Sequence, residues 1–115
     1  MAVKVHVIID EVCKRRGNVT KDDLLSRNRS HRFVDARHLV AYVAKVTTNY
    51  SISAIGRYMG GRDHSTIFNS LRQARKKLRE DPSYEKEVSE VCNAVLDRCT
   101  IAKNPPNVLQ NVVNN

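Results

Sequence analysis

Residues 60–67 read Gly-Gly-Arg-Asp-His-Ser-Thr-Ile, and this stretch decides the fold that the sequence predicts. Segments with apolar residues at helical spacing lie on both sides of it, and two consecutive glycines interrupt the first of them. A glycine turn between two helices is typical of a helix-turn-helix, whose second helix presents its N-terminal side chains to the major groove of DNA. Residues 63–66 are therefore predicted to begin a DNA-reading helix.

The side chains at the start of this helix have chemistry suited to base edges. The Asp63 carboxylate can accept a hydrogen bond from cytosine N4, the hydroxyls of Ser65 and Thr66 can bond donors or acceptors, and the His64 ring can touch a thymine methyl. Arg62, directly before them, can reach a phosphate or a guanine edge. The free N–H groups and the positive end of the helix dipole favour a phosphate as well.

Outside the glycine turn, the apolar pattern predicts an all-α fold of about six helices, because no stretch alternates as a half-buried strand does. Gly17 suits a left-handed helix end, and Thr20 and Ser51 suit helix starts. The expected helices run from about Val3 to Arg16, Thr20 to Leu25, Val34 to Thr48, Ser51 to Met59, Asp63 to Arg79 and Asp81 to Lys103.

Each longer helix carries one apolar stripe, which predicts the core. Residues 26–32 show no such stripe and are expected to form an exposed basic connector. The chain is thus expected to be one domain over residues 1–103, followed by a flexible tail over residues 104–115. The predicted core residues of the third, fifth and sixth helices are Ala36, Leu39, Val40, Val43, Val46, Ile67, Leu71, Ala74, Leu78, Tyr84, Val88, Val91, Val95 and Cys99.

The charge of the chain predicts a polyanionic partner. There are 20 Lys and Arg residues against 12 Asp and Glu, a net charge of +8. Five basic residues stand against one acid from Ser26 to Lys45, and six against one from Gly61 to Arg79. After Arg79 the balance reverses to three against six, so the positive charge is concentrated around the glycine turn.

Several other functions are not indicated. No apolar run approaches the roughly 20 residues of a membrane span. The three cysteines and four histidines show no zinc-site spacing, and the scattered cysteines favour a reducing cytoplasm. Residues 63–65 contain the residue types of a hydrolytic triad, but neighbours on a helix diverge by about 100° and cannot form one. We expect no enzyme activity, metal, cofactor or membrane partner.

Residues 60–67 closely resemble the signature of the C-terminal DNA-binding domain of DnaA, the bacterial replication initiator, a TrpR-like all-α domain. Ser51-Ile52-Ser53-Ala54-Ile55-Gly56 is similar to the first helix of that family's helix-turn-helix, and residues 29–45 to its basic connector and long helix. The resemblance extends over about residues 3–95. It implies binding of double-stranded DNA at a DnaA-box-like site, in replication initiation or its regulation.

The resemblance also implies roles for individual residues. Asp63, His64 and Ser65 match the family's base-reading positions, and Arg29 matches an arginine that enters the minor groove. An arginine there suits a narrow, A·T-rich groove. The positions that match the family's phosphate contacts are Arg37, Lys45, Ile52, Ser53 and Thr66.

The initiator's nucleotide-binding loop has no counterpart in this sequence. Such a loop needs a Gly-x-x-x-x-Gly-Lys-Ser/Thr pattern, and none of the four glycines is so arranged. We therefore expect no nucleotide binding. The chain is expected to be either a separate small protein or a fragment of an initiator, and Met1 and the tail favour the separate protein. Such a protein would be nucleoid-associated or encoded by a phage or mobile element. A transcriptional regulator with the same reader, or a protein-interaction module using the acidic last helix, are the alternatives. The oligomeric state is left open.

Overall fold

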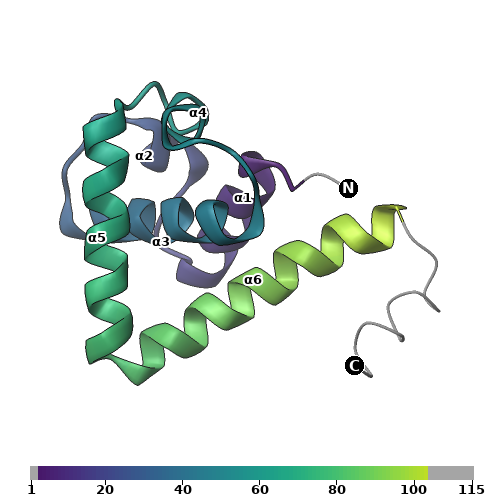
Figure 1. Cartoon of the computed structure of the whole chain (residues 1–115). Helices are drawn as coiled ribbons and strands as arrows, with labels where there is room; N and C mark the ends of the chain where they lie inside the picture. Colours follow the sequence, from purple (N-terminus) through teal and green to yellow (C-terminus); the bar gives the residue numbers. More distant parts are fainter. Residues whose placement is uncertain (1–2, 104–115) are drawn as a thin grey trace.

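The computed structural model describes residues 3–103, with side chains through residue 99, and it confirms the predicted all-α fold. Every regular element in this range is a helix (Figure 1). The helices are α1 (Val5–Arg16), α2 (Lys21–Leu25), α3 (His31–Thr47), α4 (Ile52–Tyr58), α5 (His64–Glu80) and α6 (Pro82–Lys103). The predicted tail, residues 104–115, lies outside the described range.

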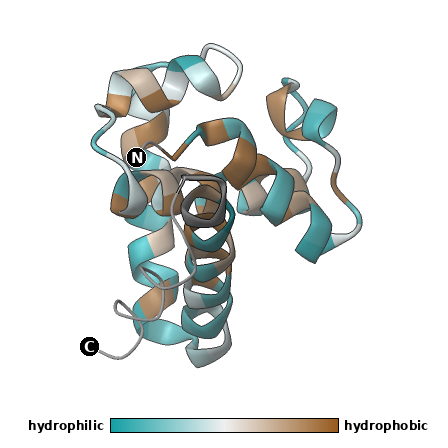
Figure 2. Cartoon of the chain, turned by 90° about the vertical axis from the view of Figure 1, so that its right-hand side faces the viewer, coloured by the Kyte–Doolittle hydropathy of each residue, from teal (hydrophilic) through white to brown (hydrophobic). Residues whose placement is uncertain are grey.

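Helix α3 is the centre of the domain and touches each of the other helices. Its inward side is fully buried along its length, with Ala36, Leu39, Val40, Val43 and Ala44 all at 0% exposure. In Figure 1, α5 stands along one side of α3, and α6 runs diagonally below it. Hydrophobic and hydrophilic stretches alternate along the ribbon in Figure 2, as expected for helices with one buried side.

The helix ends follow the local signals in the sequence. Gly17 ends α1 with φ 72° and donates its N–H to Cys13 O. Thr20 and Asp23 form a reciprocal capping box at the start of α2, and the Ser51 hydroxyl accepts from the N–H of Ala54 at the start of α4. These predicted caps are confirmed.

Two sequence predictions need correction. Helix α3 begins at His31, three residues before the expected Val34, because Phe33 is buried at 5% exposure and anchors the first turn in the core. Basic neighbours hid Phe33 from the apolar pattern. Val46 was predicted to be buried, but it is 52% exposed, since no described helix covers that side of the last turn of α3.

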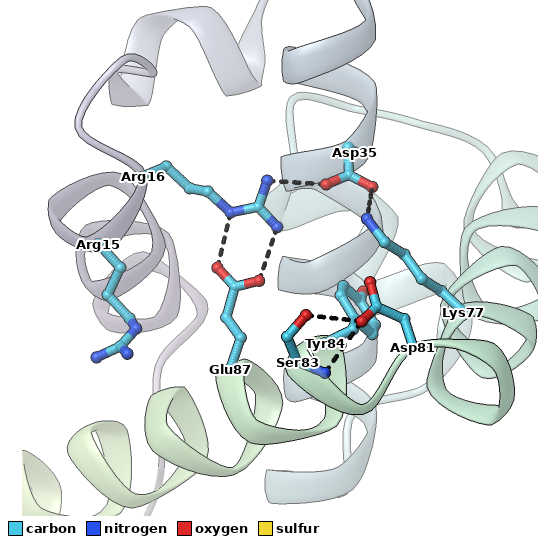
Figure 3. A pocket seen from close by; sticks show the side chains of 8 residues that line it. All are labelled: Arg15, Arg16, Asp35, Lys77, Asp81, Ser83, Tyr84 and Glu87. Carbon is cyan, nitrogen blue, oxygen red and sulfur yellow. Dashed lines mark hydrogen bonds and ion pairs between the residues drawn. The ribbon is translucent and has the colours of Figure 1, made fainter.

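Helix α6 is held to the domain by its apolar stripe and by ion pairs. The predicted core residues Tyr84, Val88, Val91, Val95 and Cys99 are all buried. Arg16 of α1 makes a two-pronged contact with Glu87 of α6, with Nε–Oε2 at 2.8 Å and Nη2–Oε1 at 3.1 Å (Figure 3). Further along the two helices, Arg15 pairs with Glu90, and Arg98 Nη1 lies 2.9 Å from carboxylate oxygens of both Asp10 and Glu11.

Asp35 extends this ionic contact to two more helices. Its Oδ2 accepts from Arg16 Nη1 at 2.8 Å and its Oδ1 from Lys77 Nζ at 2.9 Å (Figure 3). The carboxylate thus links α1, α3 and α5 directly, and α6 joins them through the contact between Arg16 and Glu87. Burial by itself raises the pKa of Asp35, but the hydrogen bonds from Lys77 and Arg16 outweigh it, and the pKa lies below its ordinary value. Asp35 is therefore an ionised linker of the helices.

In the part of the chain that the structure describes, no helix is long and apolar enough to cross a membrane.

Candidate nucleic-acid interface

The turn between α4 and α5 depends on three glycines. Gly60 and Gly61 have φ 85° and 76°, in the left-handed region that favours glycine, and they end α4 as predicted. A side chain at Gly56 would place its Cβ 2.1 Å from Arg62 O, and the same glycine's carbonyl accepts from Arg62 N at 2.9 Å. The turn therefore folds tightly back on α4, which fixes where α5 begins.

Helix α5 begins with the residues that the sequence predicted to read bases. Asp63 is the N-cap, and its Oδ1 accepts from the backbone N–H of Thr66 at 2.9 Å. This hydrogen bond holds the pKa of Asp63 below its ordinary value, so the carboxylate is ionised at neutral pH. Asp63, His64, Ser65 and Thr66 are all exposed, while Ile67 and Leu71 anchor the helix in the core.

The structure brings Arg29 to the same region, although it lies 34 positions before Asp63. Both residues line a surface hollow of about 590 Å³ between the α2–α3 connector, α3 and the start of α5. We call this the arginine-lined hollow, because four arginine residues line it. Its charged and hydroxyl-bearing lining residues are Arg27, Arg29, Arg37, Arg62, Asp63, Ser65, Thr66 and Ser70.

Arg37 was expected to bind a phosphate, but its guanidinium binds the protein's own backbone. The residue is only 6% exposed, and it donates to the carbonyls of Leu24, Asn28, Asp23 and Ser26 over 2.7–2.9 Å. Burial, and then the nearby Arg27, lower its pKa. The helical spacing of Arg37 from the buried Phe33 and Ala41 was the signal for this inward position.

Arg62, also expected at a phosphate, is similarly engaged. Its two terminal nitrogens donate to Met59 O and Ser26 O. Burial, and then the charges of Arg37 and Arg27, lower the pKa of Arg62 to about 10. The local sequence gives no signal for the contact with Ser26 O, because Ser26 is 36 residues away.

Of the remaining predicted phosphate contacts, Thr66 lines the hollow at the start of α5, whereas Lys45, Ile52 and Ser53 lie outside it, where α3 ends and α4 begins. Lys45 and Ser53 are exposed, whereas Ile52 is half-buried and packs against the core. Ile52 can therefore offer a phosphate its backbone N–H but no polar side chain. Arg27 was missed by the sequence analysis, although its place two residues before Arg29 was an available signal.

Basic residues around α4 and α5 are largely free of carboxylate partners. Within residues 3–99, each ion pair involves a cation of α1 or α6, or Lys77. The exposed basic residues that have no ion pair there include Arg27, Arg29, Lys45, Arg57, Arg72, Arg75, Lys76 and Arg79. This side of the domain thus presents uncompensated positive charge to a partner.

The fold and this site define a helix-turn-helix domain with an exposed polar start to its second helix. Residues 5–74 match the sequence model of the bacterial DnaA protein helix-turn-helix. The chain belongs to this family.

Relatives with the same printed name, chromosomal replication initiator protein DnaA, match most of the chain. The protein of Bartonella quintana is 38% identical over 80 residues, which are 70% of this chain and 16% of that protein. The Corynebacterium jeikeium protein is 33% identical over 93 residues, 81% of this chain and 16% of that protein. The Bacteroides thetaiotaomicron protein is 31% identical over 90 residues, 78% of this chain and 19% of its own length. The chain thus spans less than a fifth of these relatives.

Proposed function

We propose that this protein binds double-stranded DNA sequence-specifically at a DnaA-box-like site, in replication initiation or its regulation. One observation carries the proposal: Asp63, Ser65 and Thr66 at the exposed start of α5 line the same arginine-lined hollow as Arg29, and His64 is exposed in the same first turn. The start of α5 and Arg29, which are far apart in the sequence, can therefore contact the same DNA duplex.

Helix α5 suits the major groove. An α-helix with its side chains is about 10–12 Å across, which fits a groove about 12 Å wide. Asp63 caps the helix with Oδ1, which leaves Oδ2 to accept from cytosine N4. His64 and Ser65 follow it as exposed residues of the first turn of α5. Arg29 extends from the connector to the adjacent minor groove, and Lys45 and Ser53 meet phosphates from the other end of the helix-turn-helix.

The chain is proposed to act without hydrolysing a nucleotide. Its four glycines occupy a helix end and the turn around α4, at positions 17, 56, 60 and 61. None belongs to a phosphate-binding loop with the required lysine. The domain therefore binds its DNA site without nucleotide hydrolysis, and any step that needs hydrolysis is carried out elsewhere.

The proposal is tested by fluorescence anisotropy with a duplex that carries a DnaA box and a scrambled duplex of equal composition. We expect a preference for the box that His64→Ala reduces by about 1–3 kcal/mol. Six phosphate contacts would give a slope of log K against log salt of about −5, at roughly −0.9 for each contact. Arg98→Ala is the matched control, since Arg98 is paired with Asp10 and Glu11 on another side. Equal, salt-sensitive binding to both duplexes would contradict sequence reading.

A protein-interaction role through the acidic last helix receives less support. Glu87 and Glu90 of α6 are engaged with Arg16 and Arg15 of α1, so these carboxylates already serve the fold. A transcriptional regulator would use the same DNA reader. Mapping the genomic sites that the protein occupies distinguishes promoters from replication origins.

A further inference from the structure

We propose that Arg62 is a positioning residue that holds the connector carrying Arg29 at a fixed place relative to the start of α5. The two DNA-reading elements would then act as one unit. This inference rests on the proposed DNA reading and deepens it, because it assigns Arg62 to the geometry of the site and removes it from the phosphate contacts.

The first argument is that Arg62 bridges the two elements directly. One terminal nitrogen of its guanidinium donates to Met59 O at the end of α4, and the other donates to Ser26 O in the connector. Ser26 O also accepts from Arg37 Nη2 at 2.9 Å. A carbonyl oxygen has two lone pairs, so the Ser26 carbonyl is held from α3 and from the helix-turn-helix at once.

The second argument is that the connector is held on both sides of Arg29. Asn28 O accepts from Arg37 Nη1 at 2.7 Å, and the Asn28 side chain accepts from the N–H and the hydroxyl of Ser30, each at 2.7 Å. The backbone flanking Arg29 is therefore fixed, while the Arg29 side chain is exposed. These contacts hold the backbone of a segment that the sequence predicts only to be an exposed basic connector.

The third argument is that the turn lies against the connector. A Cβ on Gly60 would come within 2.8 Å of Leu25 O, the residue before Ser26. This contact and the four carbonyl bonds of Arg37 do not depend on the Arg62 side chain. Loss of that side chain should consequently leave the domain folded while it loosens the link between Arg29 and α5.

The chemistry of the link requires the shape of arginine. A guanidinium is a rigid planar fork that reaches two carbonyls together, whereas a lysine ammonium is a single charged point on a flexible stem. Arg62→Lys keeps the charge and most of the side-chain volume but cannot reproduce the bridge. Arg62→Lys therefore separates a positioning role from a phosphate contact, which lysine would largely preserve.

The test is a double-mutant cycle with the box duplex and its scrambled control, measured by anisotropy. In the wild-type background, Arg29→Ala should reduce the box-to-scrambled affinity ratio by about tenfold or more. In the Arg62→Lys background, Arg29→Ala should reduce it less than about threefold, because the connector that carries Arg29 has lost its direct link to the turn before α5. His64→Ala should keep its full effect in both backgrounds, since α5 itself is unchanged.

A second measurement reports the geometry without DNA. Amide hydrogen exchange of Asn28 and Ser30 should be about tenfold faster in Arg62→Lys than in the wild type, while exchange in α3 stays the same. Arg62→Gln is the companion variant, and circular dichroism verifies that both variants are folded.

The outcomes separate the two proposals. A wild type that shows no preference for the box contradicts the proposed function itself. A wild type that prefers the box, with Arg29→Ala equally harmful in both backgrounds and unchanged amide exchange, contradicts the positioning role alone. If Arg62→Lys restores normal selectivity where Arg62→Gln loses it, Arg62 acts through its charge, and the inference is wrong.

Discussion

The two sides of this domain differ in whether their exposed arginines are paired with carboxylates. On the α1–α6 side, Arg15, Arg16 and Arg98 are each paired with a carboxylate, and Asp35 joins four helices through Arg16 and Lys77. Around α4 and α5, exposed cations such as Arg29 and Lys45 have no such partner among the described residues. Charge on the first side stabilises the fold, and charge on the second is available to a polyanion. The net charge of the chain does not reveal this division, whereas the distribution of ion pairs does.

The largest expected effect comes from breaking the paired side at Asp35. Its carboxylate is 15% exposed and binds Arg16 and Lys77, so Asp35→Asn leaves two cations with fewer partners. We expect the free energy of unfolding, measured with urea, to fall by about 2 kcal/mol, somewhat less than for a fully buried pair. The preference for the box duplex should be unchanged. A loss of selectivity with normal stability would contradict the division between the two sides.

The dependence of stability on pH tests whether the ionised carboxylate of Asp35 stabilises the fold. The pKa of Asp35 is lowered in the folded protein, so its contribution is present above the ordinary pKa of about 3.9 and is lost as pH falls through the folded value. The difference in unfolding free energy between the wild type and Asp35→Asn should therefore be constant from pH 7 to pH 5 and shrink below about pH 4. Carboxylates common to both proteins cancel in this difference. If this difference in unfolding free energy instead increased as the pH falls, the pKa of Asp35 would not be lowered in the folded protein.

The smallest expected effect separates single cations on the two sides. Removing one phosphate contact with Lys45→Ala should lower the salt slope of DNA binding by about 0.9, for box and scrambled duplex alike. Lys14→Ala is the matched control, because Lys14 pairs with Glu11 at 3.4 Å on α1. It should leave the slope unchanged. If Lys45→Ala and Lys14→Ala had equal salt slopes, Lys45 would not contact a phosphate.

The sequence predicted the parts of this molecule that depend on local signals. The caps at Gly17, Thr20 and Ser51 and the glycine turn before Asp63 are decided within a few residues, and each lies where expected. Helical periodicity also placed nearly all of the core. It failed at Val46, where burial depends on whether another helix happens to cover that turn.

The parts that the sequence did not predict are set by contacts between distant residues. Arg16 and Glu87 are 71 positions apart, and Arg62 reaches the Ser26 carbonyl across 36. Roles carried over from a family resemblance do not show whether a guanidinium is free, and for Arg37 and Arg62 it is bound to carbonyls. The proposed base-reading residues are exposed, and their contacts with DNA stay a prediction.

The most direct test of the central claim is an NMR titration of the ¹⁵N-labelled protein with the box duplex. We expect the largest amide shift changes at Arg29, Ser53 and residues 64–66, with little change at Asp10, Arg15 and Glu90. Shifts concentrated on the α1–α6 pairs, with the start of α5 unperturbed, would contradict the account and move the DNA-binding surface to the opposite, paired side.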